Sequence, residues 1–427
     1  MMTFNPKLFP LSRCAACAAL LAAAASSAVC AASVSIGGMY DTGLKYTFVN
    51  DGIHGTETAL GMESSMLDSS RFAIRAHEDI SDQLSVGFIA ESGFRADSGQ
   101  LQEQDIFFNL GSLFYLAHKQ YGELWMGRLG TMRSGATPAG FQILGQRTSP
   151  FGSGWDGYGA GALYAMPFIG FSVDNALLYK SPVINGLQLD IETSFGGTDG
   201  GDENKANTDR YSAAALTYDR GPLRLVTVLE YMNENSSKGS RDDEIAVTVG
   251  GSYDFTAFQL FGWAQYFRGA NHIMALSNIG DYPLFTGLDD MRGFAAAVSA
   301  KIPTGHGFTD LALSWLDAKV HDDVEAADED NVGNSLKRFG ATIAYEYPLS
   351  KSTTAYAAVG VYKDFIDART NNAPVDDPLS GQAMAGIHFN FLRFAAFFYV
   401  HHSGSSCTRL APTAHIYLHR LRKSQLG

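Results

Sequence analysis

Hydrophobic and polar residues alternate one by one over many stretches of this chain, which is typical of β-strands whose two faces meet different surroundings. Residues 33–48 show the pattern first. Because a tilted strand of about 9–11 residues can cross a bilayer, this run predicts a membrane-spanning strand. Its apolar face carries Val34, Ile36, Tyr40, Leu44, Tyr46 and Phe48, and its opposite face carries Ser35, Met39, Asp41 and Lys45.

The same alternation recurs and predicts sixteen strands in all. A polar loop, 50–68, is expected after the first of them. Short turns rich in Gly, Pro, Asp and Asn then alternate with long connections that are polar and mostly acidic. The strands are expected at 33–48, 70–77, 84–94, 112–120, 122–129, 171–181, 185–196, 210–219, 222–232, 244–255, 257–268, 291–302, 308–319, 336–347, 352–363 and 380–391.

An even number of strands, joined alternately by short turns and long loops, is typical of a single-chain outer-membrane barrel. Aromatic residues paired on one face near the strand ends match the girdles of such barrels. A soluble sandwich with an ordinary aromatic core is the alternative, which the polar opposite faces and the unequal loops disfavour. The predicted fold class is therefore all-β, a transmembrane 16-stranded antiparallel β-barrel. The aromatic pairs are Tyr46/Phe48, Tyr253/Phe255, Tyr345/Tyr347 and Phe389/Phe391.

Residues 1–32 have the features of a secretory signal peptide. Lys7 and Arg13 precede an Ala- and Leu-rich run, and small residues then provide a cleavage site near Ser33. The apolar run is too short for a transmembrane helix. Once it is removed, residues 33–391 contain no cysteine, so neither a disulfide nor a cysteine-based metal site is expected in the barrel.

Charge and motifs narrow the range of functions. The chain has 44 Asp and Glu against 31 Lys and Arg, which argues against nucleic acid as a partner. A barrel enzyme would need a nucleophile and a base close together, but the histidines are scattered and no Gly-x-Ser-x-Gly motif occurs. Residues 320–331 are rich in acids but lack the spacing of an EF-hand, so a solvated loop is expected there. We expect no enzyme, no cofactor and no metal site.

A long stretch between two predicted strands, 129–170, consists of Gly, Ala, Pro, Ser and aromatic residues. Its only charges are Arg133, Arg147 and Asp156. A segment of this length inside a compact domain is either functional or disordered. We interpret it as an ordered loop that folds into the lumen of the barrel and narrows it.

Several pieces of the chain resemble one family in order and spacing. Ser33–Gly43 is similar to the opening strand of the Gram-negative trimeric general porins, of the type found in beta-proteobacteria. The resemblance covers about residues 33–391. It implies a homotrimer in the outer membrane, a third external loop after Arg128 that folds inward as the constriction, and passive diffusion of small hydrophilic solutes and ions. The later pieces are Ser70–Ile80, Ala90–Phe94, Tyr121–Arg128, Leu178–Pro182 and Tyr347–Lys351.

The chain departs from that family at its C-terminus. Gly381–Phe391 resembles the final strand of the family, which ends the protein on an aromatic residue. Here residues 392–427 follow, with five Lys or Arg and no acid, after a barrel that is strongly acidic. This abrupt change in composition favours an appended or frame-shifted basic extension over a functional tail.

A channel of this kind needs charges at its narrowest point, because opposed charges orient water and dipolar solutes. Alternation indicates that Arg71, Arg75 and Arg128 face the lumen, together with Arg95 and Lys45. We expect the first three to form a basic wall. Asp156 should oppose them, with Asp41 or Glu91 as further acids, while Arg133 and Arg147 add bases on the loop. For each residue the alternative is simple solvation of an inward face. We predict weak ion selectivity without assigning its sign.

Overall fold

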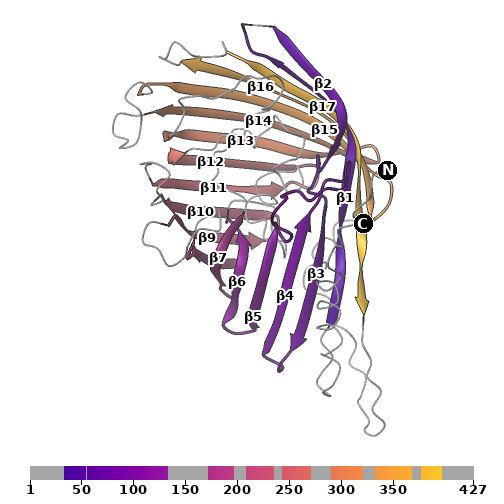
Figure 1. The fold of residues 1–427 in the computed structure, drawn as a ribbon, viewed down its shortest axis with the longest axis vertical. Coiled ribbons are helices and arrows are strands. Elements are labelled where there is room, and N and C mark those ends of the chain that lie inside the picture. The colour runs from indigo at the N-terminus through magenta and orange to yellow at the C-terminus, as the bar shows by residue number, and fades with distance from the viewer. Residues whose placement is uncertain are drawn as a thin grey trace, which may run out of the picture. The chain divides into compact units, whose positions relative to one another are not determined.

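The computed structural model describes residues 33–53, 55–132, 172–196, 208–234, 243–270, 290–320, 332–367 and 377–396 (Figure 1). The chain divides into two units, and all of these residues belong to the unit Ala32–Phe397. Their regular structure is entirely β-strand. In order, the strands are β1 (Ser33–Asn50), β2 (Thr56–Ser64), β3 (Arg71–Asp79), β4 (Leu84–Gly93), β5 (Gly111–His118), β6 (Gly122–Gly130), β7 (Ser172–Lys180), β8 (Leu187–Ser194), β9 (Arg210–Arg220), β10 (Leu223–Asn233), β11 (Glu244–Asp254), β12 (Gln259–Ala270), β13 (Met291–Thr304), β14 (Gly307–Val320), β15 (Ser335–Pro348), β16 (Thr353–Asp367) and β17 (Leu379–Ala396).

The sheet closes on itself. Each strand from β3 to β17 pairs antiparallel with the next, and β17 pairs with β1 from Asn50↔Leu379 to Val34↔Ala396 (Figure 1, indigo beside yellow). One half of β1 pairs with β2 and the other half with β3. β2 and β3 therefore lie one after the other along the same edge of β1 and together occupy one strand position. The seventeen strands thus fill the sixteen positions of an antiparallel barrel. The predicted fold class is confirmed.

The expected polar loop at 50–68 is wrong, because Thr56–Ser64 forms β2. This strand pairs with β1 alone among the described strands, and both its faces are exposed, including Leu60 and Met62. A strand with both faces exposed need not alternate, and here the only apolar residues in outer-face rows are Leu60 and Met62, opposite Tyr46 and Leu44, which is too few for a periodic signal. The last strand also continues beyond Phe391, where it was expected to end, and Phe394 pairs with Ile36.

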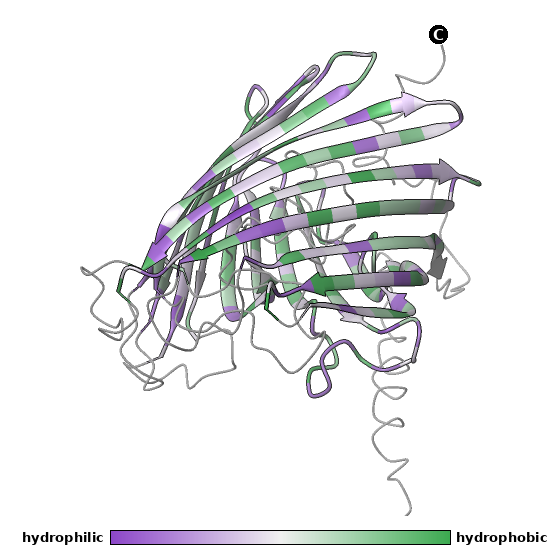
Figure 2. Cartoon of the chain, turned by 90° about the horizontal axis from the view of Figure 1, so that it is seen from above, coloured by the Kyte–Doolittle hydropathy of each residue, from purple (hydrophilic) through white to green (hydrophobic). Residues whose placement is uncertain are grey.

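Hydrophobic and hydrophilic residues alternate along the strands (Figure 2), and the two faces of the barrel differ in exposure as this alternation predicted. On β10, for example, Leu225 and Leu229 are exposed while Val228 and Glu230 are fully buried. Six of the eight aromatic residues predicted to form girdles are exposed: Tyr46, Tyr253, Phe255, Tyr345, Tyr347 and Phe389. Exposed apolar side chains at alternate positions belong on the lipid side of a membrane barrel, and polar ones on the lumen side. We call these the outer and inner faces.

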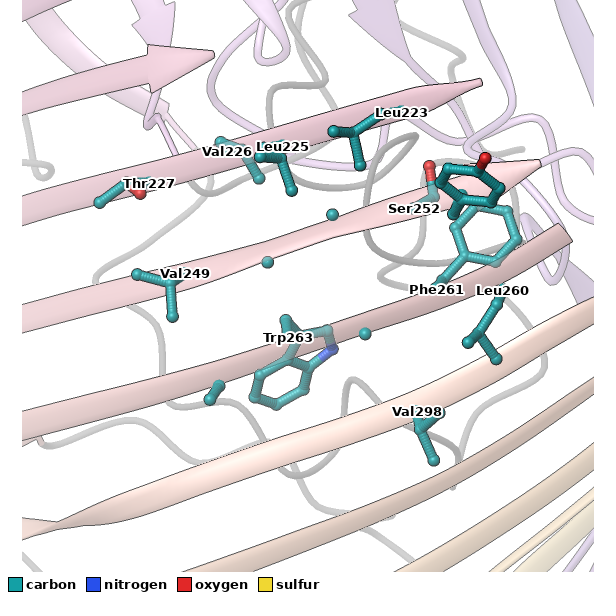
Figure 3. Close-up of a pocket in the computed structure, with 15 residues that line it drawn as sticks. Leu223, Leu225, Val226, Thr227, Val249, Ser252, Leu260, Phe261, Trp263 and Val298 are labelled. Atoms are coloured by element: carbon teal, nitrogen blue, oxygen red, sulfur yellow. The ribbon is translucent and has the colours of Figure 1, made fainter. Parts of the chain in front are cut away.

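A depression of about 650 Å³ lies on the outer face of β10–β13 (Figure 3). Gly251 and Gly262 pair directly there and leave a gap between Leu225 and Val298, which flank them in the same register row. Its lining is mostly apolar, so it belongs to the lipid-facing surface and not to the pore. No helix in the described part of the chain is long and apolar enough to cross a membrane.

Candidate pore-lining site

Arg71, Arg75 and Glu91 form a group of paired charges on the inner face of β3 and β4. The register sets Ala73 opposite Glu91, so the carboxylate lies between the two arginines of the neighbouring strand. Arg71 Nε is 2.9 Å from Glu91 Oε1, and Arg75 Nη2 is 3.2 Å from Oε2. Arg71 Nη1 also lies 3.2 Å from Asp68 Oδ1. The charges of these four side chains sum to zero.

The members of this group differ in how far solvent can reach them. The Glu91 side chain is 2% exposed and that of Arg71 10%, whereas that of Arg75 is 31% exposed. Glu91 was expected to oppose the arginines, but it lies between them on the same wall. Alternation along β3 and β4 indicated the shared face correctly. The pairing depends on strand register, which alternation does not fix.

Asp41 is completely buried and surrounded by donors, so it does not face the arginines across open space. Its carboxylate accepts hydrogen bonds from the backbone N–H groups of Met66 (3.1 Å), Leu67 and Asp68 (both 3.3 Å). The hydroxyl of Tyr356 donates to Oδ1 at 2.7 Å, and His388 Nδ1 lies 3.3 Å from Oδ2. Asp41 therefore joins β1 to β16, to β17 and to the segment between β2 and β3.

The glycine at 386 makes this arrangement possible. A Cβ at Gly386 would stand 2.5 Å from the hydroxyl of Tyr356 and 2.8 Å from the carbonyl oxygen of Thr42. Without a side chain there, the ring of Tyr356 can cross the β17 backbone and reach Asp41.

Arg128 has a different set of partners from Arg71 and Arg75. Its Nη1 lies 2.6 Å from Asp174 Oδ1, its Nη2 lies 3.6 Å from Glu103, and its Nε donates to the Asn109 carbonyl. The register places it opposite Ser112, in the row of outer-face residues, but Gly127 has φ 136° and the pairing with β7 shifts there. Simple alternation therefore cannot place this side chain, and its role in the pore stays a prediction.

The remaining predicted bases have separate positions. Lys45 pairs with Glu63 on β2, with Nζ 2.7 Å from Oε2. Arg95 follows the end of β4, is exposed, and begins a turn closed by the Gly99 N–H. Arg133, Arg147 and Asp156, with most of the expected constriction loop at 130–170, lie outside the described residues, as does most of the acidic stretch 320–331.

The sequence reasoning missed a second arginine site on the inner face. Arg338 on β15 is fully buried and bidentate with Asp364 on β16, with Nε–Oδ1 2.6 Å and Nη2–Oδ2 2.8 Å. Its guanidinium also lies 4.0 Å from the centre of the Tyr362 ring. Alternation places all three on the inner face and was the available signal. Within the described ranges no group of three or more His, Cys, Asp or Glu could hold a metal ion.

A closed sixteen-stranded antiparallel barrel with an apolar, exposed outer face and charges on its inner face is an outer-membrane channel protein. Comparison with known proteins gives the same result. Residues 15–364 match the family of Gram-negative porins. The chain belongs to this family, as its sequence resemblance predicted.

Individual relatives are similar to this chain in sequence or structure over most of their own length. An outer membrane porin protein of Bordetella pertussis is 27% identical over 414 residues, covering 88% of this chain and 98% of the relative. Outer membrane porin protein 32 of Delftia acidovorans is 25% identical, covering 85% and 93%. The solved anion-selective porin of Comamonas acidovorans has a TM-score of 0.61 at 22% identity, covering 84% of this chain and all of that one. The protein is an outer-membrane porin of a Gram-negative bacterium, a channel for passive diffusion.

Proposed function

We propose that Arg71, Arg75 and Glu91 line the narrow part of the pore and control which small hydrophilic solutes and ions pass. The observation that carries this proposal is the pair of arginines on either side of one buried carboxylate. Such a group holds its charges in fixed positions, and fixed opposed charges orient the dipoles of water and polar solutes. The protein performs no bond chemistry in this mechanism.

Arg75 is the member of the group that passing solutes meet, because its side chain is the most exposed of the three. Its charge is offset by the adjacent Glu91, so the preference for anions should be weak. The porin from Comamonas is described as anion-selective. For the present chain we propose a modest selectivity that the loop bases and acids, Arg133 and Asp156 among them, adjust further.

Planar-bilayer recordings test the proposal. The wild-type protein should give stepwise conductance, and Arg75→Gln should reduce the anion-to-cation permeability ratio by about two- to sixfold, as expected for one screened unit charge near the ion path. Lys337→Gln is the control, because Lys337 pairs with Asp317 in an exposed ion pair of β15 and β14. If wild-type steps occur but Arg75→Gln matches the control, the arginine group does not line the narrow part.

The channel unit is proposed to be a homotrimer embedded in outer-membrane lipid. The outer face of β16 and β17 offers a shallow groove of about 450 Å³ with small side chains at Ala357, Ala383 and Ala385. Small residues let a second barrel approach closely. Ala385→Trp should therefore give monomers in detergent, as measured by light scattering, whereas Val298→Trp on the outer face of β13 should leave trimers intact.

A further inference from the structure

Residues 65–70 leave the sheet between β2 and β3 and lie against the inner face of the barrel. On β1, the pairing with β3 ends at Met39 and the pairing with β2 begins at Thr42. On this side of β1 the backbone of Asp41 therefore has no partner among the described strands, whereas its other side pairs with His388 of β17. Ser65 and Ser70 take the place of a strand there. The Ser65 backbone N–H and the Ser70 hydroxyl both donate to the Asp41 carbonyl at 3.0 Å, and the Ser70 hydroxyl accepts from the Asp41 N–H at 2.9 Å.

Several contacts show that the segment turns inward. Met66 and Leu67 are buried, and a Cβ at Gly43 would stand 2.8 Å from Met66 Cε, so the methionine covers the inner side of that glycine. The backbone N–H groups of Met66, Leu67 and Asp68 all point to the Asp41 carboxylate. The other groups on that carboxylate, Tyr356 and His388, also belong to inner-face positions. We call residues 65–70 the inner shelf.

The shelf ends at the proposed pore-lining group. Its residue Asp68 lies 3.2 Å from Arg71, whose guanidinium also pairs with Glu91. The Asp41 carboxylate holds the Asp68 backbone at 3.3 Å. A chain of direct contacts thus runs from a buried carboxylate on β1, through the shelf, to the first arginine of the group.

We propose that Asp41 is a positioning residue that holds the inner shelf as a narrowing element in the lumen and, through Asp68, fixes the guanidinium of Arg71. An ionised carboxylate is suited to this task, because it can accept several hydrogen bonds and bonds to a charged acceptor are the stronger ones. The inference rests on the proposed pore role of Arg71.

The first test measures the shelf without measuring conductance. Leu67→Cys is introduced with Cys407→Ser, which leaves a single cysteine in the mature barrel if the signal peptide is removed. In the Asp41 protein this thiol should react slowly with a membrane-impermeant maleimide, because position 67 is buried. Asp41→Asn places an amide N–H₂ among the N–H donors and should release the shelf, so labelling should become faster. Unchanged labelling in a folded Asp41→Asn barrel would overturn the proposal.

The second test measures the consequence for transport. Asp41→Asn should raise the single-channel conductance and shift the reversal potential in a salt gradient. Asp68→Asn should shift the reversal potential while leaving the shelf in place. If Asp41 acts through Asp68, the shifts of the two single variants will not add in the double variant; additive shifts would refute the connection.

Two controls keep the outcomes apart. Heat-modifiable migration on gels reports whether each barrel is folded. Tyr356→Phe keeps the Asp41 carboxylate but removes a hydroxyl that donates to it and also bonds the backbone of Leu67. If Asp41→Asn does not fold, Tyr356→Phe should still accelerate labelling at position 67, by a smaller factor. No change in the labelling rate would then overturn the proposal that Asp41 holds the inner shelf. Faster labelling with unchanged conductance and reversal potential would support the hold of Asp41 on the inner shelf, but would overturn the proposal that the shelf narrows the lumen and positions Arg71. Absence of wild-type conductance would instead contradict the proposed pore function.

Discussion

Neutralising Glu91 should change ion selectivity more than it changes pore size. Glu91→Gln keeps nearly the same volume and leaves one carbonyl oxygen as an acceptor for either Arg71 or Arg75, which now lie 2.9 and 3.2 Å from its carboxylate. The charges of Arg71, Arg75, Asp68 and Glu91 sum to zero, so the substitution leaves a net charge of +1 on this part of the wall. The permeability of anions should rise and that of cations should fall.

The size of the effect follows from Coulomb's law. A unit charge about 8 Å from the ion path, in water with a dielectric constant of about 80, changes the energy of a monovalent ion by about 0.5 kcal/mol. That energy raises the permeability of an anion by a factor of about 2.4 and lowers that of a cation by the same factor, so the anion-to-cation permeability ratio rises about sixfold before screening. Salt screens over about 8–10 Å, so we expect a two- to sixfold rise in the anion-to-cation ratio, estimated from this screened interaction.

The assay is the reversal potential of a bilayer with a tenfold gradient of potassium chloride, compared between wild type and Glu91→Gln. Heat-modifiable migration first confirms that the variant barrel is folded, because removing one member of a buried ion group costs about 3–5 kcal/mol. Single-channel conductance serves as an internal control and should change little. An unchanged ratio, or a shift toward cations, in a folded barrel would show that these four charges do not act on permeating ions.

Three further predictions concern stability and pore size. Arg338→Ala should lower the free energy of unfolding in urea by about 3–5 kcal/mol, since it leaves Asp364 buried without its bidentate partner. The control Lys337→Ala removes a half-exposed ion pair and should change this free energy by less than about 0.5 kcal/mol. Equal effects of the two substitutions would contradict this reasoning. Gly386→Ala should cost about 1–3 kcal/mol by forcing Tyr356 away, whereas Gly61→Ala, with no atom within 4 Å of its Cβ position, should be tolerated. Deletion of residues 138–155 should raise single-channel conductance, and an unchanged value would mean that this stretch does not narrow the pore.

The sequence predicted all sixteen positions of the barrel because each of them has a lipid face and a lumen face, and that difference imposes a period of two. β2 could not be found in this way, since both its faces are exposed. It forms a hairpin with β1 and has no partner on its other side among the described strands. The end of β17 was missed for another reason. The prediction stopped at Phe391 because the resemblance ended there, whereas β1 offers pairing positions as far as Val34.

The candidate site was predictable in its residue types but not in its pairings. Alternation gave Arg71, Arg75 and Glu91 a common face, yet their contacts depend on the register of β3 against β4. Asp41 was identified as an inward acid, but its partners include Tyr356, which is 315 residues away along the chain. The position of Arg128 was inferred from an alternation that Gly127 interrupts with a left-handed conformation. Each of these contacts is set by tertiary structure, on which a local pattern carries no information.

The pairing of charges along the inner wall also bears on how this porin selects ions. A simple count favours cations, because acids outnumber bases by 44 to 31 over the whole chain. At two places on the described wall, however, acids are held against bases: Glu91 with Arg71 and Arg75, and Asp364 with Arg338. A pair of opposite charges acts on a passing ion as a dipole, in which the charge nearer to the ion has the larger effect. Arg75 is far more exposed than Glu91, so if this group lines the pore as proposed, a passing ion meets its positive end first, and the effect of the group should oppose that of the overall charge of the protein.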